Sequence, residues 1–125
     1  MKKVVLTDHA PRPVGPYSQA IIIGSTVYCS GQIGVDPATG KLVPGGAALQ
    51  ARQCLLNLRS VLAAAGATME NVVKTTVFIT AMADFKDVND TYAQFFTVDP
   101  PARSTVAVAA LPLGAMIEIE AVAVL

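Results

Sequence analysis

The chain has no tryptophan, a single histidine and two cysteines among its 125 residues. With His9 alone, zinc sites built from several histidines and Ser-His-Asp catalytic triads both lack parts. Cys29 and Cys54 have no CxxC partner, and two cysteines are too few for a disulfide framework. We therefore expect two buried, reduced thiols and no metal site.

Charge is also scarce, at 14% of residues, and the 9 basic residues balance the 9 acidic ones. A chain of zero net charge offers no basic surface to neutralise a run of phosphates, so we expect no nucleic-acid partner. No apolar run is long enough to span a bilayer, and the start "MKKVVLTDHAPRP" turns polar before a signal-type apolar segment develops. These absences predict a cytoplasmic protein without a membrane partner.

Hydrophobic residues, in contrast, make up 53% of the chain. The length suits one domain, so we expect a single domain over residues 1–125. For a domain of this size the composition is unusually apolar. Part of the surface is therefore expected to be covered by another chain.

Periodicity and turn residues predict the element order βββ-α-β-α-ββ. The stretch "QAIIIGSTVYCSGQIG" indicates two strands joined in a hairpin at Gly24-Ser25, and "DPATGKLVPGG" indicates a loop. Apolar spacing predicts one helix at about 47–65 and a second helix carrying the aromatic residues of 85–96. A strand over "VVKTTVFIT" separates them, and two last strands, at about 104–110 and 115–125, turn through "LPLG". This order predicts an α+β fold with both helices on one face of a mixed sheet.

Both faces of the last two strands are apolar or small. A strand in a sheet with one solvated face should instead alternate with polar residues. We therefore expect the face without helices to meet another subunit, and a closed ring of subunits would cover that face on every copy.

The segment from Pro100 to Leu125 holds only three charged residues, Arg103, Glu118 and Glu120. A tight turn at "LPLG" would place them on one face, with Glu120 diagonally across from Arg103. One interpretation is a buried ion pair between Arg103 and Glu120 that holds the sheet or a subunit contact. The other is that Arg103 binds the carboxylate of a small ligand bidentately while a glutamate handles a proton or a water. The strand register alone does not separate the two.

Other polar residues stand at similar edges. Tyr17 follows a Gly-Pro turn. Ser30-Gly31 interrupts a strand, where glycine permits a bulge or the close approach of a ligand. Asn89 lies beside the aromatic residues of the second helix. Each of these is a weak indication of a site when taken alone.

Taken together, these segments resemble the reactive intermediate deaminase family, also called RidA or YjgF-like. The resemblance covers nearly the whole chain, through "APRPVGPYSQA", "VYCSGQIGVDPATGKLV", "NLRSVLAAAG", "VVKTTVFIT", "DFKDVNDTYAQFF" and "PPARSTVAVAALPLGAMIEIEAVAV". It implies a chorismate-mutase-like fold, a homotrimer whose sheets face inward, and a ligand cleft at each subunit boundary. The implied activity is the hydrolysis of short enamine and imine acids, such as 2-aminoacrylate, to 2-keto acids and ammonia without a cofactor.

The resemblance also assigns roles to residues. Arg103 matches the arginine that binds the substrate carboxylate, and Glu118 matches the glutamate that positions water. The remaining pocket positions match Tyr17, Ser30, Gly31 and Asn89. Thr105, and Glu120 from the strand register, are further candidates for contact with the substrate. Thr105 stands where these proteins usually carry cysteine. The hairpin register favours Glu120 as the neighbour of Arg103, whereas the resemblance favours Glu118 as the catalytic residue.

Two other functions compete with this activity. A sensor of 2-keto acids would use the same Arg103 to bind a small carboxylate partner without catalysis. Ribonuclease or translation-inhibitor activity has also been attached to the family, but zero net charge, one histidine and the lack of a basic cluster argue against it.

Overall fold

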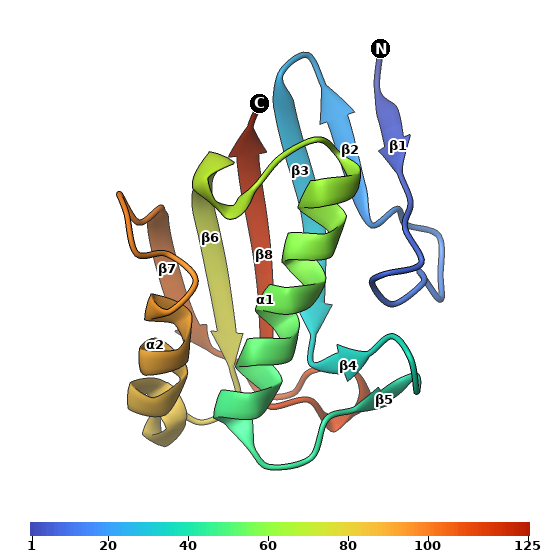
Figure 1. The fold of residues 1–125 in the computed structure, drawn as a ribbon. Coiled ribbons are helices and arrows are strands. Elements are labelled where there is room, and N and C mark those ends of the chain that lie inside the picture. The colour runs from blue at the N-terminus through green and yellow to red at the C-terminus, as the bar shows by residue number, and fades with distance from the viewer.

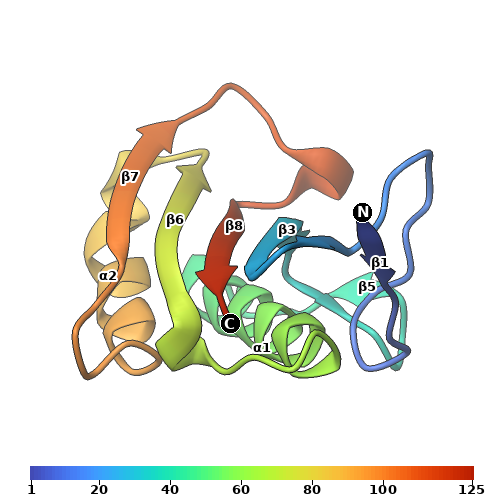
Figure 2. The ribbon, with the colours of Figure 1, turned by 90° about the horizontal axis from the view of Figure 1, so that it is seen from above.

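Two helices cover one face of a six-stranded mixed sheet in the computed structural model, which describes all 125 residues (Figures 1 and 2). The sheet strands are β1 (Lys3–Val5), β2 (Ala20–Ile23), β3 (Thr26–Ile33), β6 (Val72–Ile79), β7 (Ala102–Ala107) and β8 (Ile117–Val124), in the order β1-β2-β3-β8-β6-β7. The helices are α1 (Ala47–Ala64) and α2 (Phe85–Ala93), with 3-10 turns at Met69–Asn71, Met82–Asp84 and Pro112–Gly114. The expected α+β fold with both helices on one face is confirmed.

The core lies between the helices and the sheet. The apolar residues spaced by three and four along α1, among them Leu55, Leu58 and Leu62, are almost completely buried. Gly66 ends this helix in a backbone conformation (φ 85°) that favours glycine. Both cysteines are free and buried, as expected, and burial raises the pKa of both thiols, that of Cys29 to about 12.

Strand alternation divides the sheet into two different faces. On β8, the residues from Ile117 to Ala123 at steps of two are buried under the helices. Their neighbours Glu118, Glu120, Val122 and Val124 lie on the opposite face, which we call the open face. Apolar side chains are exposed there on several strands, including Tyr28 at 52% and Val106 at 43%. The sequence predicted that a subunit covers this face, and in the single chain it is uncovered.

The expected hairpin between the last two strands is wrong. β7 pairs in parallel with β6, whereas β8 inserts between β3 and β6 and is antiparallel to both. The unit β6-α2-β7 is a strand-helix-strand crossover, which places its two strands side by side and parallel. The connection from β7 to β8 then arches over the open face instead of closing a tight turn (Figure 2).

A second correction concerns the segment expected to be a loop after β3. It contains a small hairpin of β4 (Val35–Asp36) and β5 (Lys41–Leu42). The Asp36 carboxylate accepts a hydrogen bond from the Ala38 N–H (2.9 Å), and Gly40 has a positive φ of 73°. These turn residues stabilise the β4–β5 hairpin. Its strands are too short to show the alternation of apolar and polar residues by which a strand is predicted. The other predicted hairpin, at Gly24-Ser25, is confirmed as the β2–β3 connection.

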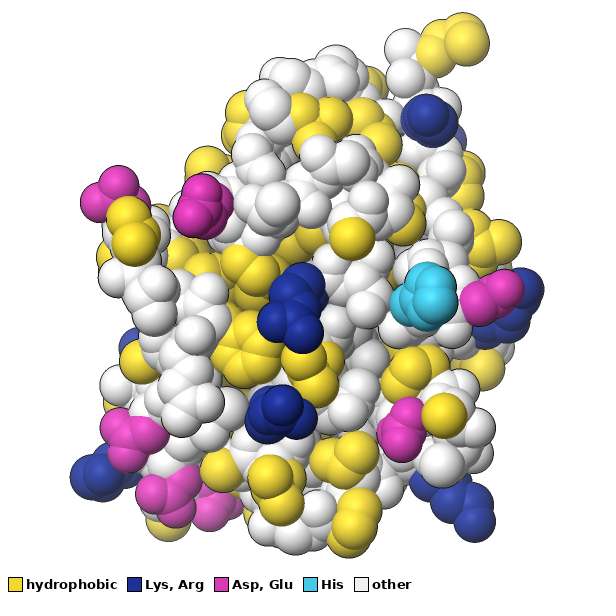
Figure 3. Space-filling view, viewed as in Figure 1, with side chains coloured by type: hydrophobic (Ala, Val, Ile, Leu, Met, Phe, Trp, Pro, Cys, Tyr) yellow, Lys and Arg dark blue, Asp and Glu magenta, His cyan; other side chains and the backbone are white.

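Neither helix is long and apolar enough to cross a membrane. On the face that carries the helices, basic and acidic side chains are dispersed among apolar ones and form no continuous basic area (Figure 3).

Candidate functional site

The residues predicted to form the site fall into two clusters in the structure. An open-face cluster comprises Tyr17, Ser30, Gly31, Glu118 and Glu120, which line one cavity. An edge cluster comprises Asn89, Arg103 and Thr105, at the sheet edge formed by β7 and the adjoining helix α2. A single chain does not bring the two clusters together.

Glu118 and Glu120 project from β8, the strand between β3 and β6. Glu118 stands opposite Ile33 and Phe78 in the ladders and is half-buried, whereas Glu120 is exposed. Burial, and after it the negative charge of Glu120, raises the pKa of the Glu118 carboxyl. A carboxylate with a raised pKa is a stronger base, so Glu118 is the better suited of the two to take a proton from water.

Gly31 allows Glu118 to occupy this position. The ladder between β3 and β8 is interrupted at Ser30 and Gly31, between the paired residues Cys29 and Gln32. A β-carbon on Gly31 would collide with the Glu118 carboxylate and lie 2.8 Å from its Cδ atom. A side chain at position 31 would therefore displace the Glu118 carboxylate from this position. Ser30 Oγ donates a hydrogen bond to the Ser18 carbonyl oxygen (2.6 Å), which ties the loop before β2 to the bulge.

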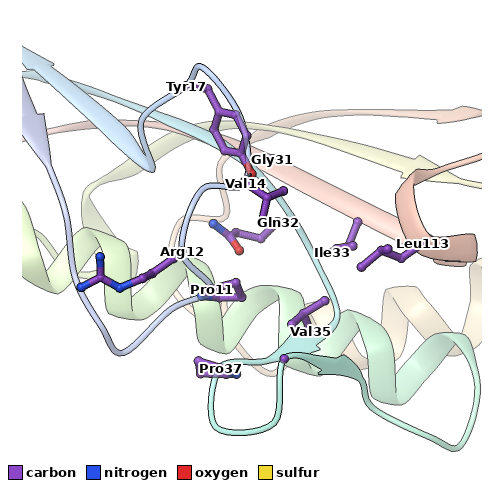
Figure 4. Close-up of a pocket in the computed structure, with 11 residues that line it drawn as sticks. Pro11, Arg12, Val14, Tyr17, Gly31, Gln32, Ile33, Val35, Pro37 and Leu113 are labelled. Carbon is purple, nitrogen blue, oxygen red and sulfur yellow. Dashed lines mark hydrogen bonds between the residues drawn. The ribbon is translucent and has the colours of Figure 1, made fainter.

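The open-face cavity has a volume of about 650 Å³. The two glutamates and Ser30 supply its polar groups, and its other walls are Val14, Ile33, Pro112 and Leu113. Tyr17 is half-exposed, and its hydroxyl oxygen accepts a long hydrogen bond from the Val14 N–H (3.5 Å). The size falls within the range of small-molecule sites, roughly 300–1,000 Å³. A second cavity of about 400 Å³, whose lining residues are drawn in Figure 4, shares Tyr17 and Gly31 with the open-face cavity. No sequence pattern predicted this second cavity.

Arg103 is held at the edge of the sheet by neutral groups. Its Nη1 atom donates a hydrogen bond to Asn89 Oδ1 (2.7 Å), and its Cζ atom lies 4.8 Å from the ring centre of Tyr92 and 5.6 Å from that of Phe85. The Tyr92 hydroxyl is itself hydrogen-bonded to Thr75 Oγ1 (2.6 Å). These neutral contacts orient the guanidinium. Because Arg103 forms no ion pair within the chain, its charge is free to bind an anion.

Phe85 and Tyr92 were expected only as packing residues of the second helix. Their contact with Arg103 could have been inferred from spacing, because Phe85, Asn89 and Tyr92 lie at i, i+4 and i+7 and therefore share a helix face. The hydrogen bond to Arg103 also explains the polar Asn89 beside aromatic residues. Two residues after Arg103, the Thr105 hydroxyl oxygen is buried and has no hydrogen-bond partner.

The intrachain ion pair between Arg103 and Glu120 is excluded by the strand order. Strand β6 separates β7 from β8. Arg103 pairs with Thr75, a buried residue on the helix side, whereas Glu120 pairs with Thr76 on the open face. The two side chains therefore project from opposite faces of the sheet. No group of three or more His, Cys, Asp or Glu side chains is placed to hold a metal ion.

The family model described as "Endoribonuclease L-PSP" matches residues 7–125. The 2-iminobutanoate/2-iminopropanoate deaminase of Bos taurus is 51% identical over 99% of this chain and 90% of its own length. Among solved structures, a putative endoribonuclease from Thermotoga maritima superposes with a TM-score of 0.97, with 49% identity over 100% of this chain and 98% of that one. The YjgF gene product from E. coli has a TM-score of 0.94 and 47% identity over 98% of both chains. The chain therefore belongs to the endoribonuclease L-PSP family, and its resemblance to the RidA and YjgF-like proteins is confirmed.

Proposed function

We propose that this protein hydrolyses short 2-imino acids, and the enamines in equilibrium with them, to 2-keto acids and ammonia. Mammalian relatives about half identical over 99% of this chain carry the name 2-iminobutanoate/2-iminopropanoate deaminase. The observation in this chain that carries the proposal is a pair of complementary groups. Arg103 is an oriented cation without an acidic partner in the chain, and Glu118 is a half-buried carboxylate with a raised pKa beside a cavity.

The reaction needs orientation and a base rather than a covalent nucleophile or a cofactor. Arg103 holds the substrate carboxylate through a bidentate pair of hydrogen bonds, and Asn89 and Tyr92 keep its guanidinium in place. Glu118 takes a proton from a water molecule while the water oxygen forms a bond to C2 of the imine. The imine nitrogen then gains that proton from the protonated Glu118 carboxyl, which gives a tetrahedral aminoalcohol and restores the carboxylate.

The second half of the reaction releases ammonia. Glu118 takes the proton of the aminoalcohol hydroxyl and returns it to the nitrogen as the C2–N bond breaks, so the nitrogen leaves as ammonia and C2 becomes the carbonyl carbon. Ser30, Gly31 and Tyr17 line the wall on which the substrate rests, and Thr105 lies two residues after Arg103 on the same side of β7. Glu120 assists by raising the pKa of Glu118.

The complete site requires two copies of the chain. Arg103 and Glu118 project from opposite faces of one sheet, so a single small substrate cannot contact both within one chain. If the β7 edge of one copy lies against the open face of the next, Arg103 of the first copy approaches Glu118 of the second. Such a contact joins two different surfaces, and a ring of three copies closes it. The exposed apolar residues of the open face would be covered in the same ring.

The direct test measures hydrolysis of 2-iminopropanoate, generated in situ from alanine by an L-amino acid oxidase and trapped in competition by semicarbazide. Glu118→Gln should lower kcat/KM by about 100-fold or more, the usual contribution of a general base. Arg103→Lys keeps the charge but not the planar fork, and should lower it by at least about tenfold while the protein stays folded. Glu70→Gln, at an exposed glutamate outside both clusters, is the matched control and should change nothing. A wild-type protein that binds 2-keto acids but does not accelerate hydrolysis would instead indicate the sensor.

A further inference from the structure

The outer face of α1 lacks the mixture of charges expected on a helix at the surface of a domain. The side chains that this helix turns away from the core recur at steps of three and four, and we call them the α1 stripe: Leu49, Arg52, Leu56, Arg59 and Ala63. All are exposed except Leu56, which is partly buried. An outer helix face usually carries polar and charged side chains. The α1 stripe is instead mostly apolar, its two charged members are both arginines, and α1 contains no acidic residue.

The two arginines of the α1 stripe have no carboxylate partner. The residues three and four positions away from each of them are all leucine or alanine, so no ion pair can form at helix spacing. The two ion pairs of the chain, in contrast, both join residues four apart, Arg12 with Asp8 and Lys86 with Asp90. In Figure 3, two basic side chains lie one above the other along α1 among apolar side chains, and the acidic side chains lie toward the margins of this face. The positive charge of the stripe is therefore not neutralised within the chain.

The geometry of the α1 stripe defines what fits it. Arg52 and Arg59 are seven residues apart, which is about 10.5 Å along a helix, and Leu56 lies between them. The Arg59 guanidinium is placed by the Phe95 ring, whose centre lies 5.8 Å from its Cζ atom. Residues at steps of three and four are those through which two helices pack side by side. A second helix with carboxylates seven residues apart would present them at the same spacing as the arginines.

Neither a further copy of this chain nor a nucleic acid supplies the complement. The ring of three copies proposed above covers the open face, whereas α1 lies on the opposite face of the sheet and stays outside (Figure 2). The exposed acidic residues of α2, Asp87 and Asp90, are only three residues apart, and the apolar Val88 between them is 2% exposed. Two arginines on either side of a leucine are also too few charges to neutralise a run of phosphates.

We infer that the α1 stripe binds an amphipathic helix of another protein, in which an apolar residue lies between two carboxylates seven residues apart. The apolar residue packs on Leu56, and the carboxylates pair with Arg52 and Arg59. The arginines select an acidic partner, and the apolar contact holds it. This binding is separate from the proposed hydrolysis, because the stripe contains no residue of the open-face or edge clusters.

The probe is a fluorescent peptide held helical by a hydrocarbon staple on its rear face. Its front face carries one leucine, with glutamate three residues before and four residues after it, which matches Arg59, Leu56 and Arg52 when the two helices run antiparallel. A second peptide has lysine in place of both glutamates. Fluorescence anisotropy at about 0.15 M salt should give a Kd below about 1 mM for the glutamate peptide and binding at least about tenfold weaker for the lysine peptide.

Charge reversal on the protein provides the decisive comparison. Both arginines are exposed, so Arg52→Glu/Arg59→Glu should fold, lose at least about tenfold in affinity for the glutamate peptide and prefer the lysine peptide. If that variant does not fold, Arg52→Gln/Arg59→Gln takes its place and should bind the two peptides equally. Lys2→Glu/Lys41→Glu is the matched control, because it changes the net charge by the same amount at exposed lysines outside the stripe, and it should bind like wild type.

Three results would overturn the inference. One is a glutamate peptide that does not saturate the wild-type protein below about 1 mM. Another is equal binding of that peptide to wild type and to the variant with altered arginines. The third is an equal loss in the control, which would show attraction by net charge alone. Binding of vesicles containing phosphatidylserine, lost in the arginine variant while the peptide fails to bind, would assign the α1 stripe to a membrane surface instead.

Discussion

Mixing two inactive variants should restore activity, because the site is proposed to use Arg103 of one copy and Glu118 of the next. Arg103→Ala removes the carboxylate-binding group, and Glu118→Gln removes the base. Each variant alone should be nearly inactive. When they assemble together, a boundary that joins the intact arginine of one copy to the intact glutamate of its neighbour is complete.

The size of the recovery follows from the directional contact. In a ring of three formed at random from equal amounts, about three quarters of rings contain both variants, and each mixed ring has one intact boundary in three. The mixture should therefore show about one quarter of the wild-type activity per chain. A second mixture combines equal amounts of wild type and the double variant Arg103→Ala/Glu118→Gln. If the site is shared between copies, this mixture should retain about one quarter of the wild-type activity per chain, because both copies at a boundary must be wild type. If the site lies within one chain, it should retain about one half.

The assay is hydrolysis of 2-iminopropanoate after the two proteins are unfolded and refolded together, and mass measurement in solution tests whether the refolded protein is a trimer. The parents refolded separately and mixed afterwards serve as the control, since exchange has not occurred. A co-refolded mixture no more active than its parents, together with half activity for wild type plus the double variant, would refute the shared site. It would also show that Arg103 and Glu118 do not act on the same substrate.

Two further predictions concern the surroundings of Glu118. Gly31→Ala places a methyl group against the Glu118 carboxylate and should lower kcat about 100-fold by displacing the base. Gly15→Ala is the control and should have little effect, because its added carbon would make an ordinary 3.7 Å contact with Tyr17. Equal activity of the two variants would contradict the role of the close approach between Gly31 and Glu118. Activity should fall as pH drops through the raised pKa of Glu118, because the protonated carboxyl cannot act as a base, and Glu120→Gln should move this acid limb to lower pH by removing the charge that helps to raise that pKa. The measurement is the pH dependence of kcat for both proteins, and an acid limb that stays in place or moves upward would argue against coupling between the two carboxylates.

Local patterns in the sequence were sufficient for much of the fold. The three- and four-residue spacing of Leu55, Leu58 and Leu62 predicted α1, and Gly24-Ser25 predicted the β2–β3 hairpin. These features were predictable because they depend on neighbours within a few residues along the chain. Long motifs in order were also sufficient to indicate the family and, through it, the residues of the candidate site.

The partners of each strand were not predictable in the same way. Periodicity showed that β7 and β8 are strands but not that β7 pairs with β6 and β8 with β3 and β6. The crossover through α2 contained the information for β7, because strand-helix-strand units place their strands in parallel. The assumption of a tight turn at "LPLG" led to the wrong register and to the wrong pairing of Arg103 with Glu120.

The sequence by itself determined which side chains are available for chemistry. The apolar C-terminal segment supplies one arginine and two glutamates, and it contains no histidine and no cysteine. Only the tertiary structure decided where they lie: Arg103 over Tyr92 and Phe85 on the helix side, and Glu118 against Gly31 on the open face. The physical reason is that the face a side chain occupies depends on which strands pair across the sheet. That choice is made by burial and by the crossovers between distant segments, and the period of a single strand does not contain it.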